Sequence, residues 1–392
     1  MTLKKYSLLF TALIFVLLVQ LFAASPSPVV ADDETMQLDF GEGLCLPNGD
    51  GQFNAADCRM AGPAGTLEEL AGLGFTLPVT PLFYTQPPAE MGNVPFNYAK
   101  VSEDIVPLYG SVEDVNAEKP NQKLPVSRIK YVSLYDKAET DFGLYYKIAN
   151  GKWISRENIV PVGTQFFQGF LFKENPTTSF GWVLDTTTSR TAPSMNAPTS
   201  GREYHRYDLV RAYQSVTEND TEWIMIGPNE WISHHSLSKI VPNYEKPEGV
   251  TADRWIEINL YEQVMIVHEG DRIVYATLVA TGVDPFFTQP GVFTIYEKIE
   301  NEYMRGAFEA DRSDYYYLED VPYIMYFDQS RALHGAYWHT LFGYQRSHGC
   351  VNLSIADSHW LYDWASVGDF VYVWDPSGKT PTDPSFYGPG GF

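Results

Sequence analysis

The chain has 392 residues, which suits two to four domains, and its 44% hydrophobic and 15% aromatic content excludes a mainly disordered protein. Its formal net charge is −22, and no cluster of Lys and Arg offsets this charge, so we exclude a role in nucleic-acid binding.

Residues 1–31 have the composition of an export segment. Two lysines precede an apolar run of 18 residues (Ser7–Ala24), and the small residues up to Ala31 suit cleavage by a signal peptidase. A retained membrane anchor is the alternative, because 18 residues is near the lower limit for a span. Both interpretations place the remaining chain outside the cytoplasm, in the cell envelope.

Residues 32–94 are rich in Gly and Pro and carry two of the chain's three cysteines. Thiols tend to pair in an oxidising compartment, and Cys45 and Cys58 lie only 13 positions apart, so we expect a disulfide between them. Cys350 is then left as an unpaired thiol, which is either incidental or reactive.

An internal repeat occupies the middle of the chain. Residues 145–155 match residues 223–233 at a constant offset of 78, and each copy reads as an alternating strand, a tight turn and a short strand bearing Trp. We therefore expect two small all-β barrels over residues 95–165 and 166–245, which resemble bacterial SH3-like modules. Binding to the cell wall and simple spacing of the next domain are equally compatible with such modules.

Residues 253–375 form the last predicted domain, which is mostly β with one short helix. Apolar alternation and turn residues predict strands at 256–260, 264–267, 273–276, 292–296 and 370–374. Ser354 and Asp357 form a capping-box pattern that opens the helix, and Gly368 follows its end. We expect the Pro/Gly-rich tail, residues 376–392, to be disordered or loosely attached.

Cys350 lies in a cluster of histidines, since four of the chain's eight fall between residues 334 and 359. A thiol is mostly protonated at neutral pH, so a cysteine nucleophile needs a base, and imidazole can take the proton and later return it to a leaving amine. The sequence supplies His334-Gly335 and then Ser347-His348-Gly349-Cys350-Val351-Asn352. Gly349 allows the backbone to approach closely, so the amides near Cys350 could bind an oxyanion.

This pattern, with the first His 16 positions before the Cys, resembles the signature of YkuD-type L,D-transpeptidases. The upstream segments agree in order: Gln263, then Ala280-Thr281-Gly282, then Pro290-Gly291-Val292-Phe293. The resemblance covers residues 253–375 and implies a mainly β fold, a YkuD-like β-sandwich with one short helix, preceded by the two SH3-like barrels. It does not extend to residues 32–94.

The resemblance also implies roles for the site residues. Cys350 is expected to be the nucleophile and His334 its acid/base. His348 and Ser347 are expected to shape the pocket, while the amides of Gly349 and Cys350 bind the oxyanion.

Asn352 stands where many members of the family have Arg, so a charged clamp for a substrate carboxylate has to be another residue, with Arg346 and Arg331 as candidates. His339 and His359 are expected to be surface or packing residues. A zinc site built from these histidines and the catalytic thiol is disfavoured, because no tight ligand pair or extra carboxylate supports it.

The function that the resemblance implies is ping-pong acyl transfer on peptidoglycan stem peptides, with no cofactor or metal. Cys350 would attack a tetrapeptide stem, D-alanine would leave, and an amine would take the acyl group, so that the cell wall is cross-linked. Two alternatives stay open: a cysteine L,D-carboxypeptidase or hydrolase that uses water, and a catalytically silent wall-binding protein.

Overall fold

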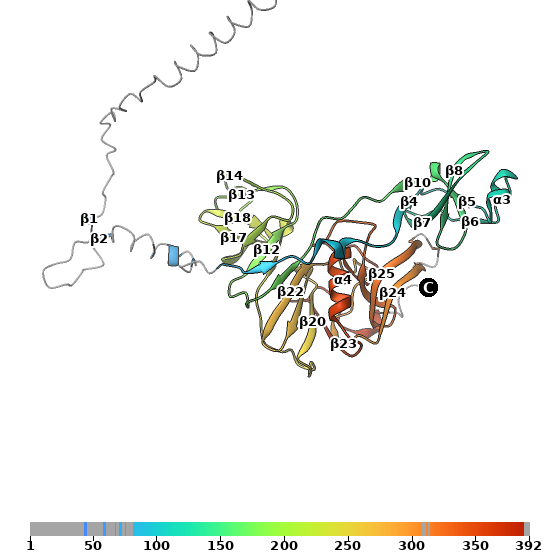
Figure 1. Ribbon diagram of the computed structural model, residues 1–392. Helices are drawn as coiled ribbons and strands as arrows, with labels where there is room; N and C mark the ends of the chain where they lie inside the picture. The colour runs from blue at the N-terminus through green and yellow to red at the C-terminus, as the bar shows by residue number, and fades with distance from the viewer. Residues whose placement is uncertain are drawn as a thin grey trace, which may run out of the picture. The chain divides into compact units, whose positions relative to one another are not determined.

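The computed structural model describes residues 81–307, 311–312 and 314–387, with short pieces at 43–44, 58–59, 67, 70–72 and 75 (Figure 1). The chain divides into two compact units, residues 1–68 and 69–392. In the first unit, the two-residue strands β1 (Gly43–Leu44) and β2 (Cys58–Arg59) pair in parallel. The expected export segment, residues 1–31, lies outside the described residues, and so does any side-chain bond between Cys45 and Cys58.

One sheet of the second unit is built mainly from residues 253–375. In order across the sheet, its strands are β23 (Gly291–Thr294), β28 (Phe370–Trp374), β20 (Arg254–Asn259), β21 (Val264–Glu269), β22 (Arg272–Leu278), β11 (Phe170–Phe172) and β3 (Tyr84–Thr85). The strands predicted in this region are therefore confirmed. The last two strands at one end of this sheet, β11 and the edge strand β3, come from segments that we expected to lie in other parts of the fold.

A second sheet carries the histidine and cysteine motif. Its main path runs β10 (Ile159–Pro161), β4 (Asn97–Val101), β7 (Ile129–Thr140), β25 (Tyr316–Asp328), β26 (Arg331–Gly335) and β27 (Val351–Leu353). Three further strands join it: β24 (Glu297–Gly306) on β25, β8 (Gly143–Ile148) on β7, and β9 (Trp153–Ser155) on β8. Strands β26 and β27 are parallel neighbours, which brings the two halves of the motif together.

The two sheets share one apolar core, and the described chain is mainly β, as expected. Buried side chains of both sheets belong to this core, among them Ile256, Ile258 and Val267 of the first sheet and Met325, Leu333 and Val351 of the second. Helix α4 (Ile355–Trp364) adds Leu361 to it. Ser354 caps this helix, since its Oγ accepts the Asp357 N–H at 3.2 Å, as the capping pattern predicts. None of the described helices is long and apolar enough to span a membrane.

Both copies of the internal repeat contain the predicted hairpin. In the first copy the hairpin is β8 and β9, followed by η2 (Arg156–Asn158) and β10. In the second copy it is β17 (Thr221–Gly227) and β18 (Glu230–Ser233), followed by η3 (His234–Ser236) and β19 (Leu237–Ile240). The copies thus share one order of elements, while their likeness to SH3 modules stays a prediction.

The two copies differ in how they pair with the rest of the chain. The second copy has two sheets of its own. The strand order of the first is β15 (Leu209–Arg211), β12 (Phe180–Val183), β19. The strand order of the second is β14 (Thr199–Tyr204), β13 (Thr187–Arg190), β18, β17, β16 (Gln214–Glu218). The first copy also holds β5 (Val106–Leu108), α3 (Val112–Asn116) and β6 (Gln122–Leu124). Its strand β7 pairs in parallel with β25, from Ile129 to Tyr131. The first copy is therefore continuous with the sheet that carries the site.

Segments at the two ends of the described chain also pack on the fold. Near its start, η1 (Ala89–Gly92) lies against α4. The expectation of a loosely attached tail is wrong for residues 376–387, because the Thr380 N–H and Oγ1 donate to the Asp375 carboxylate at 2.8 and 2.7 Å. After η4 (Pro384–Phe386), the Tyr387 ring is buried with its centre 5.3 Å from the Arg331 guanidinium carbon. The Pro/Gly-rich composition gives no sign of this aromatic anchor.

Candidate active site

The register of β26 and β27 brings the predicted catalytic residues together. Leu333 pairs with Val351 and His334 pairs with Asn352. Paired residues of neighbouring strands point to the same side of a sheet, so Asn352 shares the face of His334, and Cys350 lies directly before β27. All three line one pocket together with Ser347, His348 and Arg346. The structure therefore brings together the predicted site residues, with Gly349 in the turn between them.

His334 is held in the tautomer that a general base needs. Its ring is buried, and Nδ1 lies 3.2 Å from the Gly335 carbonyl oxygen. A carbonyl only accepts hydrogen bonds, so Nδ1 carries the proton and Nε2 keeps its lone pair. Burial lowers the pKa of His334 to about 4. The imidazole is therefore neutral at physiological pH and able to take a proton.

Cys350 is a half-buried thiol directly before β27. Burial raises its pKa, and the Ala332 backbone and the Arg331 charge act in the opposite direction. Its Sγ lies 3.8 Å from the Ser330 carbonyl oxygen, within reach of a weak S–H hydrogen bond. In the resting protein both the thiol and His334 are therefore neutral, and the proton moves when the sulfur attacks.

The turn before Cys350 is tied at several points. Ser347 Oγ donates to the Cys350 carbonyl oxygen at 2.5 Å and accepts the Gly349 N–H at 3.1 Å. Gly349 has φ +115°, and a Cβ there would lie 3.0 Å from Arg331 Nε, so only glycine fits this position without strain. Of the two amides expected to bind an oxyanion, the Gly349 N–H is therefore already engaged by Ser347.

The polar walls of the pocket differ in exposure. His348 Nε2 lies 4.0 Å from an Asp314 carboxylate oxygen, and burial lowers the pKa of this histidine. Arg331 is buried and its Nη1 is 2.9 Å from an Asp328 carboxylate oxygen, so its charge is already paired. Arg346 is exposed at the pocket and is the candidate that can reach a substrate carboxylate.

This part of the chain is similar in sequence to known proteins. Residues 253–373 match the family model described as the L,D-transpeptidase catalytic domain, YkuD. The YkuD-type resemblance is confirmed for these residues. The protein YciB of Bacillus subtilis (strain 168) carries the name of an L,D-transpeptidase. It is 23% identical to this chain over 137 residues, which cover 30% of this chain and 64% of YciB.

Solved structures give the same family name at low overall similarity. An L,D-transpeptidase from Stackebrandtia nassauensis is 26% identical, with 34% of this chain and 62% of that chain covered and a TM-score of 0.27. The catalytic domain of the E. faecium L,D-transpeptidase is 26% identical, with 32% of this chain and 100% of that chain covered and a TM-score of 0.29. The chain thus spans less than two thirds of YciB and of the Stackebrandtia protein.

His339, which we expected to be a surface or packing residue, contacts a residue that lines the pocket. His339 Nε2 lies 3.0 Å from Asn352 Nδ2, and burial lowers the pKa of His339 to about 3. His359, in contrast, lies on α4, with Nδ1 3.2 Å from the Met91 carbonyl oxygen and its ring stacked on Tyr323. Packing is therefore confirmed for His359 and also for His339, whose ring lies against Phe342, and His339 in addition contacts Asn352 of the pocket.

Residues from outside the matched domain also build the site. Ile129 of β7 lines the pocket, and the Tyr131 hydroxyl donates to the Trp338 carbonyl oxygen at 3.2 Å. Gln165, between the two repeats, donates through Nε2 to the carbonyl oxygens of Ala336 at 2.5 Å and His339 at 2.7 Å. Its Oε1 accepts the Ile355 N–H at 3.1 Å. Sequence patterns carry no signal for these contacts, because the partners lie far apart in the chain.

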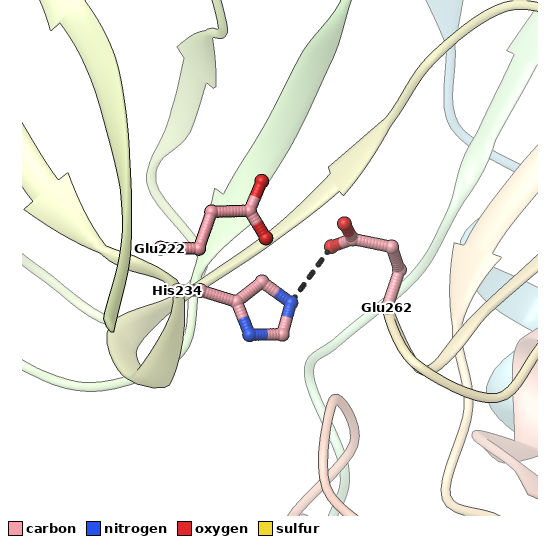
Figure 2. Close-up of side chains that lie close together, drawn as sticks. All are labelled: Glu222, His234 and Glu262. Atoms are coloured by element: carbon pink, nitrogen blue, oxygen red, sulfur yellow. Dashed lines mark hydrogen bonds and ion pairs between the residues drawn. The ribbon is translucent and has the colours of Figure 1, made fainter. Parts of the chain in front are cut away.

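A group of possible metal ligands lies away from this pocket. Figure 2 shows Glu222 and His234 of the second repeat facing Glu262, with His234 Nε2 3.2 Å from a Glu262 oxygen. The Lys239 ammonium pairs with Glu222 and lies 3.2 Å from the other Glu262 oxygen. Lys239 already supplies the positive charge that these carboxylates require, so we assign an ion-pair cluster rather than a metal site. The ligand atoms of His334, His339, His348 and Cys350 form no such group within the described part of the chain.

Proposed function

We propose that this chain is an exported L,D-transpeptidase that acylates Cys350 with a peptidoglycan tetrapeptide stem and transfers the acyl group to an amine. The observation that carries this proposal is that Cys350, directly before β27, and His334 of the parallel neighbour β26 line one pocket, inside a domain that matches the YkuD family. The apolar run in residues 1–31 supports export to the compartment that holds peptidoglycan.

The resting protonation states suit attack by the thiol with assistance from a base. His334 Nε2 takes the thiol proton as Cys350 Sγ bonds to the carbonyl carbon of the stem. The negative charge that develops on the carbonyl oxygen faces the Cys350 N–H. When the intermediate collapses, the bond to the D-alanine nitrogen breaks, His334 returns the proton to that nitrogen, and a thioester remains.

The second half-reaction reverses the roles. An amine of another stem attacks the thioester carbonyl, His334 accepts the amine proton, and the Cys350 sulfur leaves and is reprotonated. The energy of the original amide bond is kept in the thioester, so the proposed reaction requires no nucleotide or other activating group. Water in place of the amine would make the same site a carboxypeptidase. In this proposal a carboxylate of the stem pairs with Arg346, which is supported by the exposure of Arg346 at the pocket.

Intact-protein mass spectrometry after mixing with imipenem tests the nucleophile. We expect the wild type to gain the mass of one imipenem molecule, because the thiol opens the β-lactam ring, and Cys350→Ala to gain none. A structure of the E. faecium domain is described as acylated by ertapenem, which motivates the choice of a carbapenem probe. A folded wild type without an adduct would contradict the proposal and favour a silent wall-binding protein.

A donor-and-acceptor assay then separates transfer from hydrolysis. Purified tetrapeptide stems are incubated with the wild type, and the products are separated by mass. Cross-linked dimers together with free D-alanine are the expected outcome. Accumulation of tripeptide without dimer would show that water is the acceptor, and the enzyme would then be an L,D-carboxypeptidase.

A further inference from the structure

The side-chain amide of Asn352 is buried in the pocket, with only 3% of the residue exposed. Nδ2 lies 3.0 Å from His339 Nε2, whereas Oδ1 has no hydrogen-bond partner among the described residues. Buried amide oxygens are nearly always hydrogen-bonded in folded proteins. The two ends of an amide differ only in which atom is oxygen, so their assignment depends on the neighbouring donors and acceptors.

The neighbour that decides the assignment is His339. Its Nδ1 lies 3.3 Å from the Leu341 backbone nitrogen, and a backbone N–H can only donate. Nδ1 is therefore the acceptor of the ring. A neutral imidazole carries one proton, and burial keeps His339 neutral by lowering its pKa to about 3. The proton must then be on Nε2, which faces Asn352 as a donor.

A donor at His339 Nε2 requires an acceptor opposite. With Asn352 Nδ2 in that position, two donors would face each other and the amide oxygen would stay without a partner. Rotation of the amide by about 180° places Oδ1 against the His339 N–H and turns Nδ2 toward the pocket. The facing donors are then replaced by a donor and an acceptor, and the NH2 group takes the place of the oxygen, where no described residue accepts its hydrogen bond.

We propose that His339 is a positioning residue, which turns the Asn352 amide so that its NH2 group faces the pocket beside Cys350 and donates a hydrogen bond to an oxygen of the acyl donor. This role for Asn352 in substrate binding depends on the proposed acyl transfer, while the orientation of the amide does not. A fixed donor stabilises the developing charge more than a mobile one, because no reorganisation is needed during the reaction.

The backbone around His339 is held in place from outside the matched domain. The His339 carbonyl accepts the hydrogen bond from Gln165, and the preceding Trp338 carbonyl accepts the one from Tyr131. The ring also packs at 5.1 Å from that of Phe342. These contacts leave the imidazole little freedom to rotate, which a residue that orients another side chain requires.

The tautomer of His339 can be measured without any substrate. In protein with 15N-labelled histidine, two-bond 1H–15N correlations distinguish a ring protonated at Nε2 from one protonated at Nδ1. We expect the Nε2–H form for His339 at every pH between about 5 and 8. The Nδ1–H form would overturn the orientation of Asn352, whether or not the protein is an enzyme.

The acylation rate with imipenem tests the functional half. We expect Asn352→Asp to slow acylation by about tenfold or more, because the carboxylate still accepts from His339 but presents an oxygen instead of an N–H to the substrate. If Oδ1 of Asn352 faced the pocket in the wild type, a carboxylate oxygen of the variant would take its place and the rate would stay close to that of the wild type. That second result would overturn the proposal.

Variants of His339 separate positioning from simple packing. His339→Phe keeps the ring volume without a donor, and we expect acylation about tenfold slower than in the wild type. His339→Gln restores a donor at the same reach, and we expect it to recover most of the rate. His268→Gln is the matched control, because His268 is a buried histidine paired with Glu257 at 3.1 Å outside the pocket. Equal rates for the Phe and Gln variants would overturn the proposal, whereas a wild type that never forms an adduct would instead remove the proposed function.

Discussion

Gln165 and His339 are joined by a hydrogen bond of 2.7 Å across 174 residues of chain. The Gln165 side chain also forms hydrogen bonds with Ala336, directly after β26, and with Ile355, shortly after β27. A single amide thus links the chain segments that leave β26 and β27. The support of the proposed catalytic pair, His334 and Cys350, therefore includes a residue that lies before the matched domain begins.

The first prediction concerns this link. Gln165→Leu removes the partners of two carbonyl groups and one N–H, so we expect a free energy of unfolding lower by about 2 kcal/mol. Imipenem acylation should slow as well, because the chain after His334 loses its support. Gln168→Leu is the control, since Gln168 lies on the same segment and its side chain makes no hydrogen bond in the described part of the chain. Urea unfolding and adduct formation measure both effects, and identical behaviour of the two variants would contradict the prediction.

The second prediction concerns a buried carboxyl group of β25, that of Glu319, which makes the free energy of unfolding depend on pH. Glu319 accepts the N–H groups of Ser133 at 3.0 Å and Ala149 at 3.1 Å and the Tyr317 hydroxyl at 2.8 Å. Burial nevertheless raises the pKa of Glu319 from 4.5 to about 7. The folded protein therefore binds this proton more tightly than the unfolded chain does.

The sign of the pH effect follows directly. The stabilisation is complete below the unfolded pKa and is lost as the pH rises through about 7. Between these limits, we expect the free energy of unfolding of the wild type to fall by roughly 3 kcal/mol relative to Glu319→Gln. Urea unfolding of both proteins at the two ends of this range measures the difference. A constant difference would show that Glu319 keeps its charge in the folded state.

The third prediction concerns the protonation states of the catalytic pair. Burial raises the pKa of Cys350 and lowers that of His334 to about 4, so the two groups do not form a resting thiolate and imidazolium. Alkylation by iodoacetamide, which needs a thiolate, should therefore be slow at neutral pH and accelerate only in alkaline solution. Imipenem acylation should stay fast from neutral pH down to about pH 4, where His334 gains a proton and can no longer act as a base.

Rates of both reactions as a function of pH check this prediction. His334→Asn should abolish the fast acylation and leave the alkylation profile almost unchanged. An alkylation rate that already reaches its plateau below neutral pH would show a preformed ion pair instead.

The fourth prediction concerns the ion-pair cluster of Figure 2. Lys239→Met leaves the carboxylates of Glu222 and Glu262 without their cation, and we expect a loss of about 3–5 kcal/mol of stability. Lys246→Met is the control, because Lys246 pairs with Asp253 in an exposed position and should cost less than about 1 kcal/mol. Neither Zn²⁺ nor EDTA should change the Tm of the wild type. A rise in Tm with Zn²⁺ would show that the cluster binds a metal after all.

The sequence by itself indicated the family that residues 253–373 match and supplied the candidates for the nucleophile, Cys350, and its base, His334. This was possible because the Ser347-to-Asn352 motif is contiguous and its chemistry depends on residue types at short spacing. Alternation of apolar residues likewise determined the strands of this domain, and local turn residues determined the hairpin of each repeat. These features depend on neighbours a few positions away.

Three contacts are decided only by the tertiary structure. Strand β7 pairs with β25, and the Gln165 side chain bonds to the segments that follow β26 and β27. His339 contacts Asn352. The first two contacts join segments that lie far apart in the chain, 174 residues in the case of Gln165 and His339, and a local pattern carries no information about such partners. The pKa values of His334 and Glu319 also depend on burial, which is a property of the packed chain. The type of a residue sets the reactions that its side chain can take part in. The contacts and the burial that the fold gives to this side chain decide its protonation state and its partners.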